Sequence, residues 1–204
     1  SRVGKSYLAT VLAITLLGNK AAVETIPMAE YTSPHHVARL SGAPPGYIGY
    51  GNPGLITRIF EKHNYSLVVL VDEIEKGHPR IMDYLYPLWR PGVGKDMMGN
   101  EVYAKNSVFV VSSNLGLSDP VNLEDRVSQM HVKRIYQLLK QGDQDQLDYE
   151  VNHFLADITR RAVEGFLRPD TITRLTRPEA IFFKWLHPDD AHRLIDELWL
   201  PRLI

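Results

Sequence analysis

The sequence predicts an α/β fold in which helices cover both faces of a parallel sheet. Two short runs, at residues 67–71 and 108–111, are continuously apolar, which is typical of parallel strands buried on both faces. Segments with helical composition lie before and between these runs. Because strands that alternate with helices form parallel sheets, we expect these strands to pair in that way.

Hydrophobic periodicity and turn residues divide the chain into short elements. The first half predicts a helix at residues 5–17, a strand at 23–28, a helix that Ser33-Pro34 caps and starts, a loop at 41–54 and a helix at 55–63. The second half predicts a strand at 67–71, a helix at 79–89, an irregular hairpin at 93–105, a strand at 108–111, and long helices at 121–139 and 147–166, separated by the polar stretch 141–146. A short strand at 180–183 and a helix after His187-Pro188 are expected last.

Composition excludes several classes of protein. The 204 residues, 44% of them hydrophobic, suit one α/β domain, or one domain with part of a second. The formal net charge of −1 gives no electrostatic basis for a nucleic-acid partner, so we expect none. The lack of cysteine excludes disulfides and cysteine nucleophiles. No apolar run reaches the roughly 20 residues that span a bilayer, so we expect no membrane contact and a cytoplasmic location.

The first chemical motif is the tripeptide Gly4-Lys5-Ser6 at the start of a predicted helix. It matches the end of the phosphate-binding pattern G-x-x-x-x-G-K-[ST]. In that pattern the helix N-terminus holds phosphate oxygens, the lysine reaches the β- and γ-phosphates, and the hydroxyl binds Mg²⁺. The first glycine of the pattern would lie upstream of Ser1. A solvated helix start therefore explains the tripeptide equally well when it is taken alone.

Polar side chains follow both apolar strands. Asp72 and Glu73 come directly after residues 67–71, at the carboxyl end of a strand, where ligands bind in parallel sheets. Asp72 suits the shell of a magnesium ion, and Glu73 suits the deprotonation of a water. Asn114 ends the second strand and would hydrogen-bond a water and a phosphate there. The alternative for Asp72 and Glu73 is that they are ordinary acids at the exit of a strand. The alternative for Asn114 is that it is a turn residue before Gly116.

Aromatic, histidine and methionine residues outside these motifs suggest less. Tyr47 and Tyr50 lie among glycines and prolines, and composition leaves open whether they pack in a core or contact a partner. The adjacent His35 and His36 do not share a helix face, so we expect no histidine metal site. We interpret the pair Met97-Met98 as hairpin packing.

Several segments together resemble the Clp AAA-plus protein unfoldases, and specifically the second ATPase module of the two-ring members. The matching segments are Gly4-Lys5-Ser6 and residues 28–31, 37–50, 71–79, 112–116 and 166–170. The runs Gly-Ala-Pro-Pro-Gly-Tyr-Ile-Gly-Tyr and Val-Asp-Glu-Ile-Glu-Lys are the most specific. The ATPases that recycle contractile sheaths in type VI secretion are one group within this family that the sequence fits.

The resemblance implies a P-loop NTPase of the AAA-plus type that binds ATP and Mg²⁺. The implied residues are Val3, Gly4, Lys5 and Ser6 in the Walker A motif, Asp72 and Glu73 in Walker B, Asn114 as first sensor, and Tyr47 and Ile48 in the pore loop that contacts a polypeptide. Ser6 and Asp72 would hold the magnesium ion. Arg174 resembles the arginine finger that reaches the neighbouring subunit, with Arg168 and Arg177 as rival candidates.

Three functions compete on this basis. The leading hypothesis is an ATP-driven unfoldase that threads polypeptide through a homo-hexameric ring. The second is an ATP-binding scaffold or switch on the same fold, with weak turnover or none. The third, a nucleic-acid remodeller, is disfavoured by the charge balance and by the tyrosines of the loop.

The sequence also departs from the family. Thr173 stands where an asparagine is usual, and Arg177-Pro178 replaces an acidic stretch. Residues 91–101 barely resemble the second pore loop, and residues 141–146 are interpreted as an insertion. We expect residues 1–187 to be a large ATPase subdomain without its first strand, and residues 188–204 to start the helical lid. Because a missing strand leaves its neighbours without hydrogen-bond partners, we expect these residues alone to hydrolyse ATP poorly.

Overall fold

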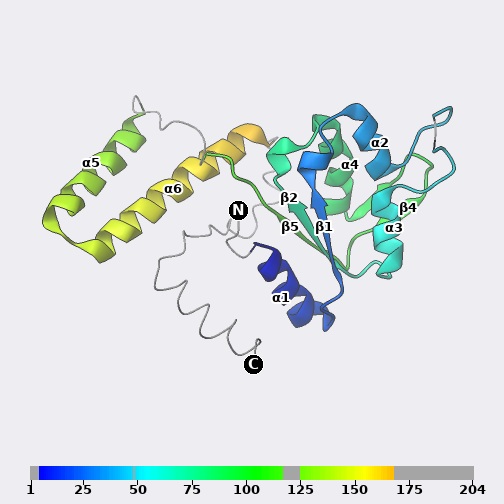
Figure 1. The fold of residues 1–204 in the computed structure, drawn as a ribbon, viewed down its shortest axis with the longest axis horizontal. Coiled ribbons are helices and arrows are strands. Elements are labelled where there is room, and N and C mark those ends of the chain that lie inside the picture. Colours follow the sequence, from blue (N-terminus) through cyan, green and yellow to red (C-terminus); the bar gives the residue numbers. More distant parts are fainter. Residues whose placement is uncertain (1–4, 48, 117–124, 168–204) are drawn as a thin grey trace.

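The central feature is a three-stranded parallel sheet (Figure 1). The computed structural model describes residues 5–47, 49–116 and 125–167. Strands β1 (Val23–Pro27), β2 (Val68–Asp72) and β5 (Val108–Val111) lie in the order β1-β2-β5, and both pairings are parallel. The predicted parallel sheet is therefore confirmed for these strands. Its carboxyl edge is where Pro27 lies opposite Asp72 and Val71 lies opposite Val111.

Strand β2 is buried on both faces. Val68 and Leu70 pack against Ala9 and Ala13 of helix α1 (Lys5–Leu17). The alternate residues, such as Val69, belong to a larger cluster on the other face. Because successive side chains of a strand point to opposite faces, a strand between two helical layers must be apolar throughout. This explains the continuous apolar run and confirms helices on both faces.

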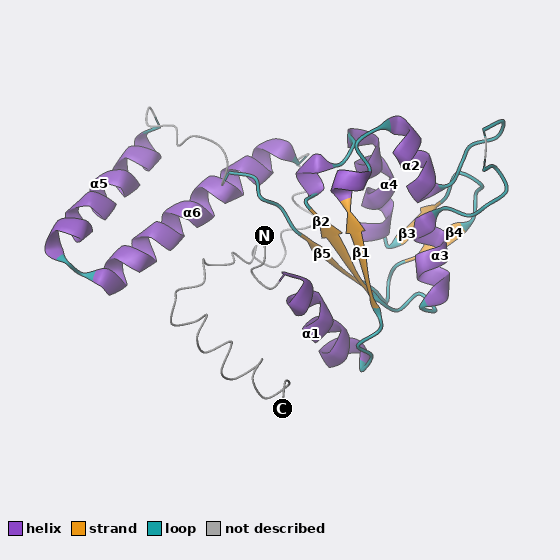
Figure 2. Ribbon diagram, in the orientation of Figure 1, coloured by secondary structure: helices purple, strands orange, loops and turns teal. Residues whose placement is uncertain are grey.

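The second layer contains three helices and a small hairpin (Figure 2). These elements are α2 (Pro34–Ser41), α3 (Leu55–Lys62), α4 (Pro79–Trp89), and strands β3 (Val93–Lys95) and β4 (Glu101–Tyr103), with short 3₁₀ turns η1 (Met28–Glu30) and η2 (Ile74–Lys76). Strands β3 and β4 pair antiparallel, which confirms the predicted hairpin. Pro34 begins α2 and Ser33 occupies its N-cap position, as expected, although the Ser33 side chain accepts no capping hydrogen bond.

Helices α5 (Arg126–Gln141) and α6 (Gln144–Phe166) form an antiparallel pair that extends away from the sheet in Figure 1. The prediction that residues 141–146 separate two helices is wrong in extent, because Gly142 and Asp143 alone lie between them. Gly142 has a φ of 72° and ends α5 through a bond from its N–H to the Leu138 carbonyl. The Asp143 carboxylate accepts a hydrogen bond from the Gln146 N–H at 3.1 Å. These are ordinary helix-terminal signals, and a polar composition does not exclude them.

Helix α6 returns to the sheet beside the end of β5. A Cβ added to Gly116, whose φ is +79°, would lie 2.9 Å from the Ile158 carbonyl oxygen. This close approach places α6 against the segment that follows β5. No helix in the described part of the chain is both long and apolar enough to cross a membrane. The strand predicted at 180–183 and the helix predicted after His187-Pro188 lie outside the described residues.

Candidate functional site

The carboxyl edge of the sheet brings together four of the polar residues that the sequence singled out. Lys5 Nζ lies 3.5 Å from Asp72 Oδ1, and Asn114 Nδ2 donates a hydrogen bond of 2.9 Å to Glu73 Oε1. Lys5 is the first residue of α1, and Asp72 ends β2. The side chain of Lys5 is 13% exposed and that of Asp72 is 35% exposed. The Lys5 ammonium and the Asp72 carboxylate therefore lie together at the carboxyl edge of the sheet, partly accessible to solvent.

Ser112 connects these groups, and the sequence analysis missed it. Its buried hydroxyl accepts hydrogen bonds from Lys5 Nζ at 3.3 Å and from the Glu73 N–H at 3.1 Å. The same hydroxyl donates to the Asp72 carboxylate. A hydroxyl has one donor and two acceptor positions, so its capacity is filled. The signal was its position two residues before Asn114, because residues two apart in extended backbone share a face.

We expect Ser112→Ala to weaken both the fold and the site. The substitution removes a hydrogen-bond partner from the Glu73 N–H and from the partly exposed Asp72, and the net contribution of one hydrogen bond is about 0.5–1.5 kcal/mol. Denaturant unfolding and equilibrium binding of a fluorescent ATP analogue would measure the two effects. Ser113→Ala is the matched control, since the Ser113 hydroxyl accepts a local bond from the Leu115 N–H. Equal losses in both variants would contradict the role of Ser112.

Glu73 is held in an unusual conformation. Its φ is 54°, a left-handed value that costs a non-glycine residue about 1–3 kcal/mol. While Asn114 binds Oε1, Lys76 Nζ donates to Oε2 at 2.8 Å. The hydrogen bond to Glu73 raises the pKa of the Lys76 ammonium. Both carboxylate oxygens of Glu73 therefore have a protein partner.

Glu75 is a second residue that the sequence analysis did not use. Its Oε1 accepts a hydrogen bond of 3.0 Å from the Asn114 backbone N–H. Its Oε2 is buried, with no hydrogen-bond partner in the described structure. Two carboxylates thus hold Asn114, one through its backbone and one through its side chain. The available signal was the cluster of acids at the end of β2 and just after it, at Asp72, Glu73 and Glu75.

These residues fit a nucleotide triphosphate with its metal ion. A lysine at a helix N-terminus suits phosphate oxygens, and Ser6 follows in the first turn of α1. Asp72 is a carboxylate of the kind that Mg²⁺ prefers. Val3 and Gly4 lie outside the described residues, as do Arg168, Thr173, Arg174 and Arg177.

The glycine- and proline-rich loop between α2 and α3 is narrow at its base and exposed at its tip. Tyr47 is 64% exposed and Tyr50 is 54% exposed, so neither side chain packs in a core, and contact with a partner stays a prediction. A Cβ added to Gly54 would lie 2.5–2.6 Å from backbone atoms of Leu40, Ser41 and Gly42. Glycine is therefore required where the two ends of the loop meet. Ile48 lies outside the described residues.

The turn between β3 and β4 is hydrogen-bonded to residues at the two ends of this loop. The Met97 N–H donates to the Ser41 carbonyl at 2.9 Å, and the Thr57 hydroxyl donates to Asp96 Oδ2 at 3.0 Å. Burial favours a raised pKa for Asp96, but hydrogen bonds from Asn100, Thr57 and the Met98 N–H outweigh it and leave the pKa lowered. Met97 and Met98 are exposed, so the interpretation of this pair as hairpin packing is wrong.

The fold and the site define the class: this is an α/β domain with the arrangement of a P-loop ATPase. The family model described as AAA domain (Cdc48 subfamily) matches residues 1–177. The chain therefore belongs to the AAA domain family, Cdc48 subfamily, and is an AAA ATPase domain.

Curated relatives are similar over nearly the whole chain. ClpB of Aquifex aeolicus is 32% identical over 196 residues, which cover 96% of this chain and 18% of the relative. ClpB of Mycoplasma genitalium is 34% identical over 196 residues, covering 96% and 23%. The chloroplastic ClpD2 of Oryza sativa is 32% identical over 195 residues, covering 95% and 19%. The chain thus spans 18–23% of the length of these relatives.

A solved structure shares the fold. It is a closed state of Hsp104 with ATPγS and FITC casein, and it matches with a TM-score of 0.68 at 22% identity. The match covers 97% of this chain and 30% of that chain. It supports the α/β architecture described above.

Proposed function

We propose that the protein hydrolyses ATP with Mg²⁺ and uses the free energy to unfold and translocate a polypeptide. The observation that carries this proposal is the network of Lys5, Asp72, Glu73 and Asn114 at one edge of the sheet. The similarity to ClpB chaperones supports the same activity. The alternative of an ATP-binding scaffold without turnover is less favoured, because Lys5, Asp72, Glu73 and Asn114 lie together at the edge of the sheet.

Each residue of the network has a role in this proposal. Lys5 and the start of α1 would bind the phosphates, while Ser6 and Asp72 would hold the magnesium ion. Bound Mg²⁺–ATP supplies the phosphoanhydride bond and an electrophilic γ-phosphorus. Glu73 would accept a proton from the water that attacks the γ-phosphorus, the bond from that phosphorus to the β–γ bridging oxygen would break, and ADP would leave. Asn114 would orient Glu73 and the γ-phosphate. Arg174 supplies positive charge to the site of a neighbouring subunit.

The assembly and the substrate belong to the same proposal. We propose a homo-hexamer in the cytoplasm, in which Tyr47 and Ile48 contact an extended polypeptide and no nucleic acid takes part. Residues 1–187 form the large ATPase subdomain, and residues 188–204 start the helical lid. The exposure of Tyr47 at the tip of a narrow loop supports this arrangement.

We expect Tyr47→Ala in the full-length protein to retain ATP hydrolysis but to slow unfolding of a tagged fluorescent protein. Burial of one aromatic side chain against a substrate contributes about 1.5–3 kcal/mol, so the loss should reach about tenfold or more. Tyr149→Ala is the matched control, because Tyr149 is 70% exposed on α6, away from the loop. Unchanged unfolding by Tyr47→Ala would refute the role of the loop.

A further inference from the structure

The general base of the proposed reaction is engaged by a cation. Lys76 Nζ lies 2.8 Å from Glu73 Oε2, while Asn114 holds Oε1. A general base must accept a proton from a water within hydrogen-bond reach. The Lys76 ammonium occupies one of the two oxygens that such a water would use. In this arrangement Oε2 of Glu73 is not available to accept a proton from the water.

Of the two partners of Glu73, Lys76 is the easier to release. Its side chain is 50% exposed, and solvent screening leaves an exposed ion pair with little net stabilisation. Asn114 is fixed more firmly, because its backbone N–H also bonds to Glu75 at 3.0 Å. A small rearrangement of one lysine side chain would therefore free Oε2 and leave the Asn114 contact intact.

The backbone keeps Lys76 within reach after release. Lys76 belongs to η2, and its N–H donates to the Glu73 carbonyl at 2.9 Å. The left-handed φ of Glu73 starts this turn and brings the two side chains to the same side. The ion pair can therefore re-form without refolding of the segment.

We propose that Lys76 is a positioning residue that withholds Glu73 from the attacking water, and that its release precedes each hydrolysis event. This inference rests on the proposed function, since it assigns a partner to the base of that reaction. Lys76 itself touches neither the nucleotide nor the water. It sets how often Glu73 is available, and it therefore acts on kcat and leaves ATP affinity unchanged.

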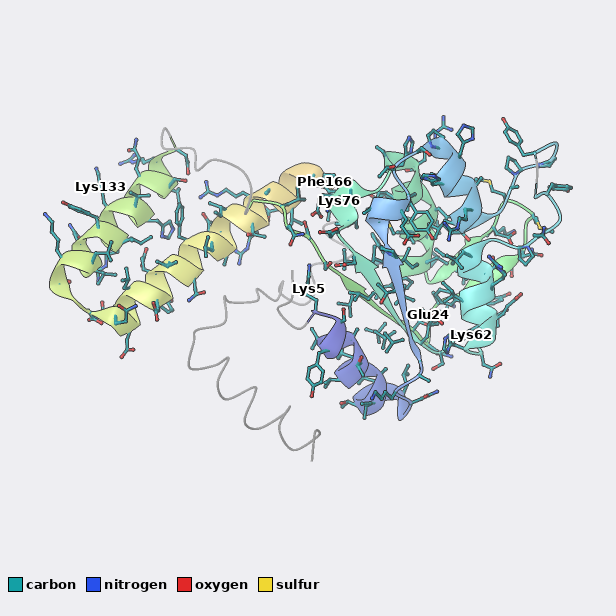
Figure 3. All side chains as sticks on the ribbon, viewed as in Figure 1. Lys5, Glu24, Lys62, Lys76, Lys133 and Phe166 are labelled. Atoms are coloured by element: carbon teal, nitrogen blue, oxygen red, sulfur yellow. The ribbon has the colours of Figure 1, made fainter. Side chains whose placement is uncertain are left out.

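The kinetic test compares three variants of the full-length protein. Lys76→Gln removes the cation, Lys76→Arg keeps it, and Lys62→Gln removes a matched exposed lysine. Lys62 pairs with Glu24 near the amino end of β1, far from Lys5 and Lys76 (Figure 3). We expect Lys76→Gln to raise basal kcat about two- to fivefold, as loss of an exposed ion pair allows. The other two variants should match the wild-type protein, and the dissociation constant of a fluorescent ATP analogue should be the same in all.

A second readout tests the contact without turnover. Mass spectrometry would follow acylation of Lys76 by acetic anhydride in the nucleotide-free protein. Glu73→Gln should increase the acylation rate of Lys76, because the ammonium loses its anionic partner, and should leave that of Lys62 unchanged. An unchanged Lys76 rate, or a normal wild-type kcat with no gain in Lys76→Gln, would overturn the proposal. A wild-type protein that hydrolyses no ATP would instead contradict the proposed function.

Discussion

Glu73→Gln is expected to leave ATP bound and to lower kcat by about 10²–10⁴-fold, the usual contribution of a positioned general base. Glutamine keeps an oxygen that accepts the hydrogen bond from Asn114 Nδ2, which is 2.9 Å long in the wild-type protein. It has no anionic oxygen to take a proton from water. The site should therefore assemble normally and fail at the chemical step. Phosphate release and retention of a radiolabelled nucleotide in the full-length protein would measure both properties.

Glu164→Gln is a suitable control for this experiment, because Glu164 is exposed on α6. It should hydrolyse ATP at the wild-type rate. A wild-type protein that binds ATP without turnover, together with no change in function on Glu73→Gln, would favour the scaffold alternative. Loss of nucleotide binding in Glu73→Gln would show that Glu73 supports the site structurally instead of acting as the base.

Gly54→Ala is expected to cause the largest loss of stability among single-methyl additions to the loop. The new Cβ would lie 2.5–2.6 Å from backbone atoms of residues 40–42, and backbone atoms cannot rotate away as a side chain can. The φ of Gly54 is −59°, an ordinary value for alanine, so the effect is purely one of space. Overpacking of this kind costs about 1–3 kcal/mol or more. Denaturant unfolding would measure the loss.

Gly165→Ala provides the opposite result in the same assay. Gly165 lies in helix α6, and nothing lies within 4 Å of a Cβ added there. Alanine in a helix is favoured over glycine by about 0.8–1.0 kcal/mol, so this variant should be slightly more stable.

Substrate unfolding should fall in Gly54→Ala, because the loop that carries Tyr47 loses its narrow base. Equal stability of the two variants would contradict the close approach at Gly54.

The sequence predicted the sheet well because its signals are local. The apolar run of β2 has no polar interruption, and this requires apolar contacts on both faces, which Ala9 and Ala13 provide on one of them. The P-loop lysine and the acid pair were likewise recognisable from residue type and from position at the ends of elements.

The features that sequence missed depend on contacts between distant segments. Ser112 is a common residue at a strand end, and its importance arises from three partners on α1, β2 and the turn after β2. The left-handed φ of Glu73 has no signal in its residue type, since glutamate does not favour that region. Met97 and Met98 are exposed in a turn that Asp96 closes by accepting hydrogen bonds from the Met98 and Asn100 N–H groups.

The most direct test of the central claim is a cryo-EM structure of full-length Glu73→Gln with ATP and Mg²⁺. The account predicts a triphosphate at the start of α1, with its terminal phosphates beside Lys5 Nζ and a magnesium ion beside Asp72. A nucleotide bound elsewhere on the domain, with the Lys5–Asp72 ion pair intact and no phosphate beside it, would contradict it.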